Sequence, residues 1–339
     1  MPDPSLGPFI LIVVLAIGFG LVNGFNDAAN AIATVVGTRV LSPRNAIILA
    51  AVANMVGAAT GLEVARTIGK GILTEEVMLQ FQYVPVMAAL GAVVIWGTVA
   101  TYLGLPVSIT HGFIAGLASA GIAVAGTQAV VWGKIVEVGS SVAIAPVLGF
   151  VGGFVLMVAM LWLLQRLAPD RIRVIFGRLQ WLTAAFMAYS HGKNDGQMPI
   201  GVITMALVVH SGDSALWESI PLWVIAVSAL AISSGTAIGG WRVIKTLGMR
   251  VTTLRPVHGF AAEASAATVI ELASQRGIPV STTHCISSSI MGVGATRRLS
   301  AVRWGVAGNI VTAWVLTFPI CGALGYVFAH LLRPIFNSG

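Results

Sequence analysis

Charged residues are scarce in this sequence. Only 9% of its 339 residues are Asp, Glu, Lys or Arg, compared with roughly 25% in a typical soluble domain. Hydrophobic residues make up 57%, which excludes an ordinary water-soluble fold. Cysteine is scarcer still, because Cys285 and Cys321 are the only two and both lie in apolar stretches. The sequence therefore contains neither a disulfide framework nor a cysteine-rich metal site.

Long polar stretches are also missing, and apolar runs take their place. Runs of roughly 20 residues, enough to cross a bilayer as a helix, recur from Phe9 to Leu332, and about ten of them fit. We predict an all-α, polytopic membrane protein. The first run follows Asp3 rather than a basic segment, and no cleavage site follows it, so we expect it to be retained. The net charge of +7 is spread over short loops, which argues against nucleic acid as a partner.

Two pairs of similar motifs recur in the same order, at a spacing of roughly 170 residues. The pairs are GFNDAAN (24–30) with HGKNDGQ (191–197), and LPVSITH (105–111) with IPVSTTH (278–284). Two independent pairs at similar spacing are improbable by chance. We therefore predict two homologous halves, residues 1–165 and 179–339, joined by a basic linker at 166–178.

Equivalent loops of the two halves differ in charge. The loop after the first apolar run contains Arg39 and Arg44, whereas its second-half equivalent contains Asp213 and Glu218. The next pair of loops reverses this difference, because there the second copy is the more basic one. Cytoplasmic loops are enriched in Lys and Arg. We therefore predict inverted repeats of about five membrane segments each, with the linker in the cytoplasm and both termini outside the inner (plasma) membrane.

An Asn-Asp pair lies inside an otherwise apolar segment in each half. A carboxylate within the membrane is costly unless it is paired or faces water, so Asp27 and Asp195 are expected to be functional. Carboxylate and amide oxygens suit Na⁺ or a titrating proton. We predict cation binding, with Na⁺ at the two aspartates, by Asn26, Asp27, Asn30, Asn194, Asp195, Gln197 and Glu263. The alternatives are structural: helix–helix hydrogen bonds by the asparagines and ion pairs by the aspartates. For Glu263 they are a gate or an ion pair with Arg255. Lys193 is expected to neutralise a carboxylate, contact an anion or reach the membrane interface.

The Pro-Val-Ser-x-Thr-His motif occurs once in each half and has the residue types that start a helix. A helix that begins inside the membrane directs its first N–H groups and hydroxyls at the break, which creates an anion site. We predict broken helices that meet near the midplane. The anion-binding residues expected there are Ser108, Thr110, His111, Ser281, Thr282, Thr283 and His284. The alternatives are that Pro, Ser and Thr only kink spanning helices and that the histidines are structural.

At these motifs the chain resembles the inorganic phosphate transporter (PiT) family of cation-coupled symporters. The strings that carry the resemblance are GFNDAANAIAT, HGKNDGQ, LPVSITHG and IPVSTTHCISSSIMGVG. The resemblance implies two inverted repeats with re-entrant hairpins, phosphate at the Ser/Thr motifs, cations near the Asn-Asp motifs, and a homodimer. Three features depart from common family patterns. Ile109 replaces a hydroxyl residue, Met198 and Pro199 follow Gln197, and the linker is short, which indicates a prokaryotic member.

Together these observations favour a secondary active transporter that imports inorganic phosphate by symport with Na⁺ or H⁺. Anion entry into an inside-negative cell is opposed by about 2.3 kcal/mol per charge per 100 mV, so accumulation requires co-transported cations. Two alternatives remain: a symporter for sulfate or another oxyanion, and an anion channel. The sequence lacks a metalloprotease-type motif and nucleophile–base spacing. We therefore expect no enzymatic activity and no cofactor apart from the co-transported cation.

Overall fold

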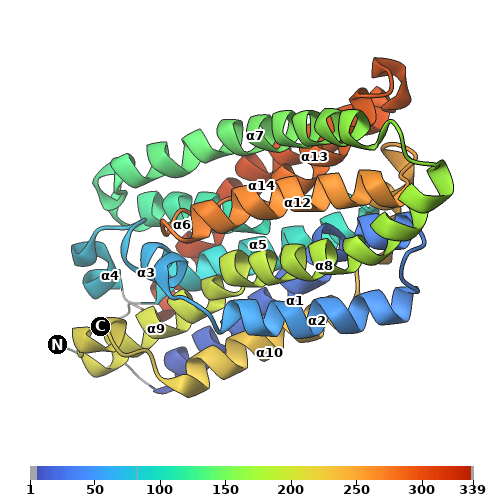
Figure 1. The fold of residues 1–339 in the computed structure, drawn as a ribbon. Helices are drawn as coiled ribbons and strands as arrows, with labels where there is room; N and C mark the ends of the chain where they lie inside the picture. Colours follow the sequence, from blue (N-terminus) through green and yellow to red (C-terminus); the bar gives the residue numbers. More distant parts are fainter. Residues whose placement is uncertain (1–5, 82, 337–339) are drawn as a thin grey trace.

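The computed structural model describes residues 6–81 and 83–336, and this part of the chain is mostly helical (Figure 1). The first half contains α1 (Leu6–Gly37), α2 (Pro43–Ala58), α3 (Glu63–Lys70), α4 (Glu75–Phe81), α5 (Val84–Leu103), α6 (Ile109–Ala125) and α7 (Trp132–Leu164). The second half contains α8 (Pro169–Asp195), α9 (Gln197–Ser211), α10 (Leu222–Ile238), α11 (Trp241–Lys245), a π-helical turn (Thr246–Arg250), α12 (Pro256–Ser274), α13 (Thr282–Ala295) and α14 (Trp304–Phe336). The predicted all-α class is confirmed.

Four of these helices are long and apolar enough to cross a membrane, namely α1, α5, α7 and α14. The number rises to six if α2 with α3, and α10 with α11, each form one span. These two pairs bend by 71° and 61° at short breaks. The fold is therefore that of a multi-pass membrane protein in which several of the predicted segments are broken.

The order of elements in the first half recurs in the second. α1, the pair α2–α3, the hairpin α5–α6 and the long helix α7 correspond in order to α8, α10–α11, α12–α13 and α14. Helices α1 and α8 run in opposite directions, and the start of α1 lies at the end of the bundle opposite the α7–α8 turn (Figure 1). The segment predicted as a linker, 166–178, is mostly helix, because α8 begins at Pro169.

Each half contains a helix break at its Pro-Val-Ser motif. Residues 104–108 separate α5 from α6, and residues 275–281 separate α12 from α13. The breaks predicted at Pro106 and Pro279 are thus confirmed. Each proline lies two residues before the N-cap, instead of in the first helical turn as expected, because the serine of the motif takes the cap position.

The second helix of each hairpin is capped by that serine. Ser108 Oγ accepts a hydrogen bond from the backbone N–H of His111 at 3.2 Å, and Ser281 Oγ accepts one from His284 at 3.1 Å. A single cap leaves other first-turn N–H groups without an intrahelical partner. These groups of α6 and α13 are directed at the hairpin tips.

The last helix of each half packs on the hairpin of the other half. Helix α7 lies against α13, and α14 lies against α6. A Cβ at Gly153 would approach the Ser289 carbonyl oxygen to 2.6 Å, and a Cβ at Gly325 would approach the Gly116 carbonyl oxygen to 2.5 Å. Backbones this close require glycine. The two halves are therefore interlocked, which holds both hairpins in the interior.

Candidate ion and anion site

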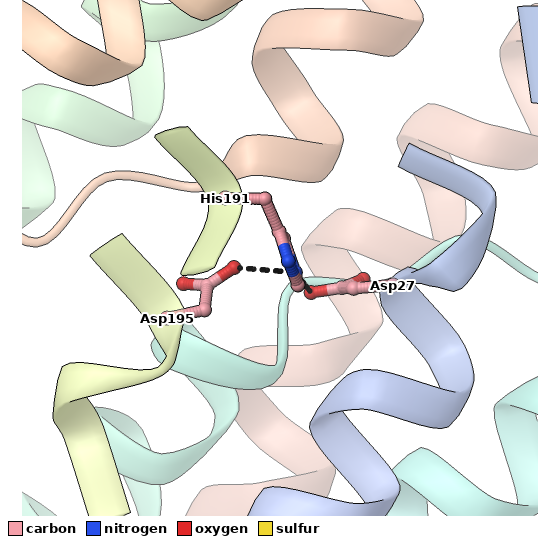
Figure 2. Close-up of side chains that lie close together, drawn as sticks. All are labelled: Asp27, His191 and Asp195. Carbon is pink, nitrogen blue, oxygen red and sulfur yellow. Dashed lines mark ion pairs between the residues drawn. The ribbon is translucent and has the colours of Figure 1, made fainter. Parts of the chain in front are cut away.

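Asp27 of α1 and Asp195 of α8 lie on either side of His191, which is also on α8 (Figure 2). His191 Nε2 lies 3.8 Å from Asp27 Oδ2 and 3.3 Å from Asp195 Oδ2. All three side chains are buried. Within the described ranges, neither carboxylate has an ion pair with Lys or Arg. The two Asn-Asp motifs, far apart in the sequence, therefore form one acidic site.

This cluster has the ligands of a small cation site. One ligand atom each from Asp27, His191 and Asp195 lies within 4.8 Å of the others. Asn54 Oδ1 lies 2.9 Å from His191 Nδ1. Because an amide oxygen only accepts, Nδ1 carries a hydrogen, and Nε2 faces the carboxylates. Two buried carboxylates are costly without compensation, and a bound cation, a proton on His191 or a proton on one carboxyl would supply it.

Threonines of the anion motifs donate to these carboxylates. Thr110 Oγ1 donates to Asp195 Oδ1 at 2.9 Å, and Thr283 Oγ1 lies 3.0 Å from Asp27 Oδ1. Each of these bonds joins the hairpin of one half to the aspartate of the other. The Thr283 hydroxyl also lies 3.0 Å from the Val107 carbonyl, so the two hairpin tips meet at the site. The predicted anion and cation motifs thus share one location.

The two carboxylates differ in their hydroxyl donors. Asp195 accepts a second hydrogen bond, from Thr282 at 2.8 Å. The residue equivalent to Thr282 in the first hairpin is Ile109, which is buried and has no hydroxyl. Asp27 therefore has one threonine donor where Asp195 has two. Ile109, which replaces the hydroxyl residue of the family pattern, therefore lies at the site itself.

The first asparagine of each Asn-Asp pair anchors a hairpin. Asn26 Nδ2 donates to Thr101 Oγ1 at 2.6 Å, near the end of α5. Asn194 contacts Ser274 Oγ at 2.9 Å, at the end of α12. Thr101 and Ser274 hold equivalent places in the two halves, so the same contact occurs twice. These amides position the hairpins relative to the helices that carry the aspartates.

Asn30 lies one turn beyond Asn26 on α1 and reaches the second hairpin. Its Nδ2 donates to Thr282 and Thr283 at 3.1 and 2.9 Å. The side-chain oxygens of Asn26 and Asn30 are buried and have no hydrogen-bond partner in the described part of the chain. Both oxygens are therefore available as cation ligands.

The side chain of Gln197 contacts the start of α3. Its Oε1 accepts hydrogen bonds from the backbone N–H groups of Val64 and Ala65 at 3.0 and 3.2 Å. The side chain thus caps the first turn of α3. Lys193, close to Gln197 in sequence, forms an ion pair with Glu271 at 2.5 Å. It neutralises that carboxylate, and neither Asp27 nor Asp195.

Glu263 forms a separate buried cluster with neutral donors. Its Oε1 accepts hydrogen bonds from Thr34 and from Gln180 Nε2, the latter at 3.0 Å, and its Oε2 accepts one from Thr183 at 2.5 Å. These donors come from α1 and α8, and Glu263 is on α12. The alternative pairing with Arg255 is not observed, because the carboxylate is bonded to these three donors.

His111 and His284 face each other with ring centroids 5.3 Å apart. His111 stacks on Phe318, and the His284 ring lies 4.1 Å from that of Trp314, so both rings border α14. Neither ring nitrogen of His111 has a hydrogen-bond partner among the described residues. The two histidines, in the first turns of α6 and α13, therefore pack against each other and against aromatic residues of α14.

His191 is the site residue that the sequence interpretation did not assign. It precedes Asp195 by four residues, and this spacing places two side chains on the same face of a helix. That spacing could have identified it. The partner carboxylate, Asp27, lies on another helix, and no pattern in the sequence reveals that contact.

The comparisons with known proteins agree with this geometry. The sequence matches the Phosphate transporter family over residues 23–171 and 165–325. The chain belongs to the phosphate transporter family. A member from Bacillus subtilis, a "Probable low-affinity inorganic phosphate transporter", is 43% identical, and the alignment covers 96% of this chain and 98% of that one. A family member of the same description from Rhizobium meliloti is 39% identical, with 95% and 96% covered.

A solved structure also has this fold. It is described as "The sodium-dependent phosphate transporter" and matches with a TM-score of 0.89 at 27% identity. The match covers 97% of this chain and 100% of that one. The resemblance to the phosphate transporter family is thus confirmed at the level of both sequence and fold.

Proposed function

We propose that this family member imports inorganic phosphate together with Na⁺ and that both bind where the hairpin tips meet Asp27 and Asp195. The observation that carries the proposal is the pair of bonds from Thr110 and Thr283 to the aspartates of the opposite halves. They place anion-motif hydroxyls directly on the carboxylates. The names of the relatives support phosphate as the solute, and that of the solved structure supports Na⁺.

Cation binding controls anion binding in this mechanism. The threonine hydroxyls of both hairpins donate to the two carboxylates. A cation on the carboxylate oxygens competes with these bonds and cancels the negative charge. The released hydroxyls then turn to phosphate, which is no longer repelled. The oxygens of Asn26 and Asn30 complete the cation's oxygen ligands.

Phosphate binds at the first turns of α6 and α13. The first-turn N–H groups of each helix are directed at the tips, and the positive helix ends favour an anion. Ser108 and Ser281 hold these turns as caps, so their part in binding is to shape the site. No permanent lysine is needed, which allows the anion to leave.

Glu263 provides a second, separate cation position or a gate. Its carboxylate bridges α12 to α1 and α8 through hydroxyl and amide groups. A cation that passes between the aspartates and this cluster would remain next to oxygen atoms. Asn30 and Thr34 lie one turn apart on α1, where Asn30 contacts Thr282 and Thr283 and Thr34 donates to Glu263.

The two halves act as inverted repeats in alternating access. The opposite directions of α1 and α8, and the recurrence of the Asn26 and Asn194 anchors, support this arrangement (Figure 1). Rocking of one half against the other exposes the shared site to each side in turn. We further propose a homodimer in the inner (plasma) membrane, with both termini outside.

The test is phosphate counterflow in proteoliposomes with sodium and pH gradients imposed separately. We expect an inward sodium gradient to drive accumulation of labelled phosphate and a pH gradient alone to fail. Accumulation driven only by a pH gradient would show that the coupling ion is H⁺ and not Na⁺. Flux without any cation gradient dependence would indicate a channel, and full competition by sulfate would indicate a general oxyanion carrier.

A further inference from the structure

A pocket of about 760 Å³ lies on the flank of the protein between α7, α13 and α14. Its volume falls within the roughly 300–1,000 Å³ of small-molecule sites. The lining is apolar apart from His284 and Ser288 on α13. The pocket is separate from the acidic site, because Asp27, His191 and Asp195 do not line it.

The pocket lies at mid-height of two membrane spans. Pro146 and Pro319 line it, and each is near the centre of a 33-residue helix. At a rise of about 1.5 Å per residue, either end of these helices is roughly 25 Å away. At this depth a bilayer contains only hydrocarbon. A lipid headgroup cannot reach the pocket, whereas an acyl chain can.

The rim of the pocket faces the membrane. Val147 and Val151 of α7 are 59% and 51% exposed, and Val315 of α14 is 63% exposed. All three line the pocket. On a membrane span, exposed valines contact lipid tails. The opening therefore leads directly into the acyl-chain region.

The floor of the pocket touches both hairpins. Trp314 lines it and donates from Nε1 to the Pro106 carbonyl, in the first hairpin, at 3.1 Å. His284 lines it beside Trp314 and directly follows Thr283, the donor to Asp27 in the second hairpin. A molecule in the pocket would thus contact Trp314, which is bonded to the first hairpin, and His284, which belongs to the second.

We propose that the pocket holds the end of a lipid acyl chain, which packs behind both hairpins and stabilises them. The occupant is hydrocarbon because the lining, the depth and the rim are all apolar. Filling the space restores contacts that an empty cavity would lose. The chain end thereby supports the positions of Pro106 and His284.

Quenching of tryptophan fluorescence by brominated lipids tests this occupancy. The purified protein is placed in phosphatidylcholine vesicles whose chains carry bromine either near the chain end or near the carbonyl. The contribution of Trp314 is the difference between the protein and its Trp314→Phe variant. We expect chain-end bromine to quench this contribution more strongly than bromine near the carbonyl.

Pocket-filling variants provide the second arm. Val147→Phe and Val315→Phe should lose most of the Trp314 quenching and most of the rise in unfolding temperature that long-chain lipid gives in detergent. Val155→Phe is the matched control, because Val155 is 58% exposed on the same helix but does not line the pocket. Equal quenching in filled and control variants would refute the proposal. If the protein is a dimer and the pocket-filling variants are monomers, the proposal is also refuted, because the pocket would then bind a second copy of the chain. Neither readout depends on phosphate transport.

Discussion

At the scale of single residues, the site consists of charges and the hydroxyls that touch them. Asp27 and Asp195 are buried without a lysine or arginine partner in the described chain, and His191 alone lies between them. Burial of like charges is costly. In the proposed mechanism a bound cation offsets that cost.

Removal of either charge should uncouple the transporter. We expect Asp27→Asn and Asp195→Asn to reduce sodium-driven phosphate uptake to the level of empty vesicles, because the amide no longer attracts the cation. Uptake in proteoliposomes and size-exclusion chromatography are the measurements. Asp170→Asn, at an exposed carboxylate of α8, is the control and should behave as the unmodified protein. Concentrative uptake by both site variants would exclude the coupling role.

Phosphate uptake should depend on the hydroxyl group of Thr283 more than on the shape of its side chain. Thr283→Val removes the bonds to Asp27 and Val107. Loss of a hydrogen bond to a charged group costs about 1.5–3 kcal/mol, so we expect uptake to fall roughly 10–100-fold. Thr283→Ser keeps the hydroxyl and should retain most activity. Thr268→Val, on the exposed face of α12, should have no effect. Equal activity of the valine and serine variants would contradict this assignment.

At the scale of elements, the hairpins depend on helix starts inside the membrane. The sequence motif predicts both breaks, because Pro disfavours helix at the residue before it and Ser caps the helix after it. It does not predict how the tips meet. Contacts such as Thr283 to Val107 depend on the packing of α7 on α13 and of α14 on α6.

Loss of a hairpin cap should affect transport more than loss of an ordinary cap. Ser281→Ala removes the cap of α13, and Ser42→Ala removes the corresponding bond at the start of α2. Each should cost about 1 kcal/mol of stability. Only Ser281→Ala should also weaken phosphate binding, because it loosens the turn that presents Thr282 and Thr283. Parallel measurements of thermal unfolding and phosphate affinity separate the two effects, and an equal loss of affinity in both variants would argue against the hairpin site.

At the scale of the whole molecule, the two halves form one interlocked body with a site between them. Recurring contacts such as Asn26–Thr101 and Asn194–Ser274 indicate equivalent architecture in each half. Glu263, in the second half, accepts hydrogen bonds from donors on α1 and α8, whereas the buried Leu90 holds the equivalent position in the first half. The two halves therefore differ in chemistry at this position.

The orientation can be tested with single cysteines. The α6–α7 turn and the α7–α8 turn lie at opposite ends of the bundle (Figure 1). Gln128 in the first turn and Leu167 in the second are exposed. We expect an impermeant thiol reagent added to whole cells to label Gln128→Cys and to spare Leu167→Cys. The natural cysteines are buried and should give little background. The reverse labelling would place the termini in the cytoplasm.

Local chemistry in the sequence determined the helical class, the membrane setting, the two hairpin breaks and the importance of the Asn-Asp pairs. Each of these follows from neighbouring residues, through apolar length, capping or the cost of a buried charge. Only the tertiary structure decided which threonine bonds which aspartate, that His191 lies between the aspartates, and that Gln197 caps α3. These depend on contacts between residues distant in sequence, which the interlocking of the two halves creates.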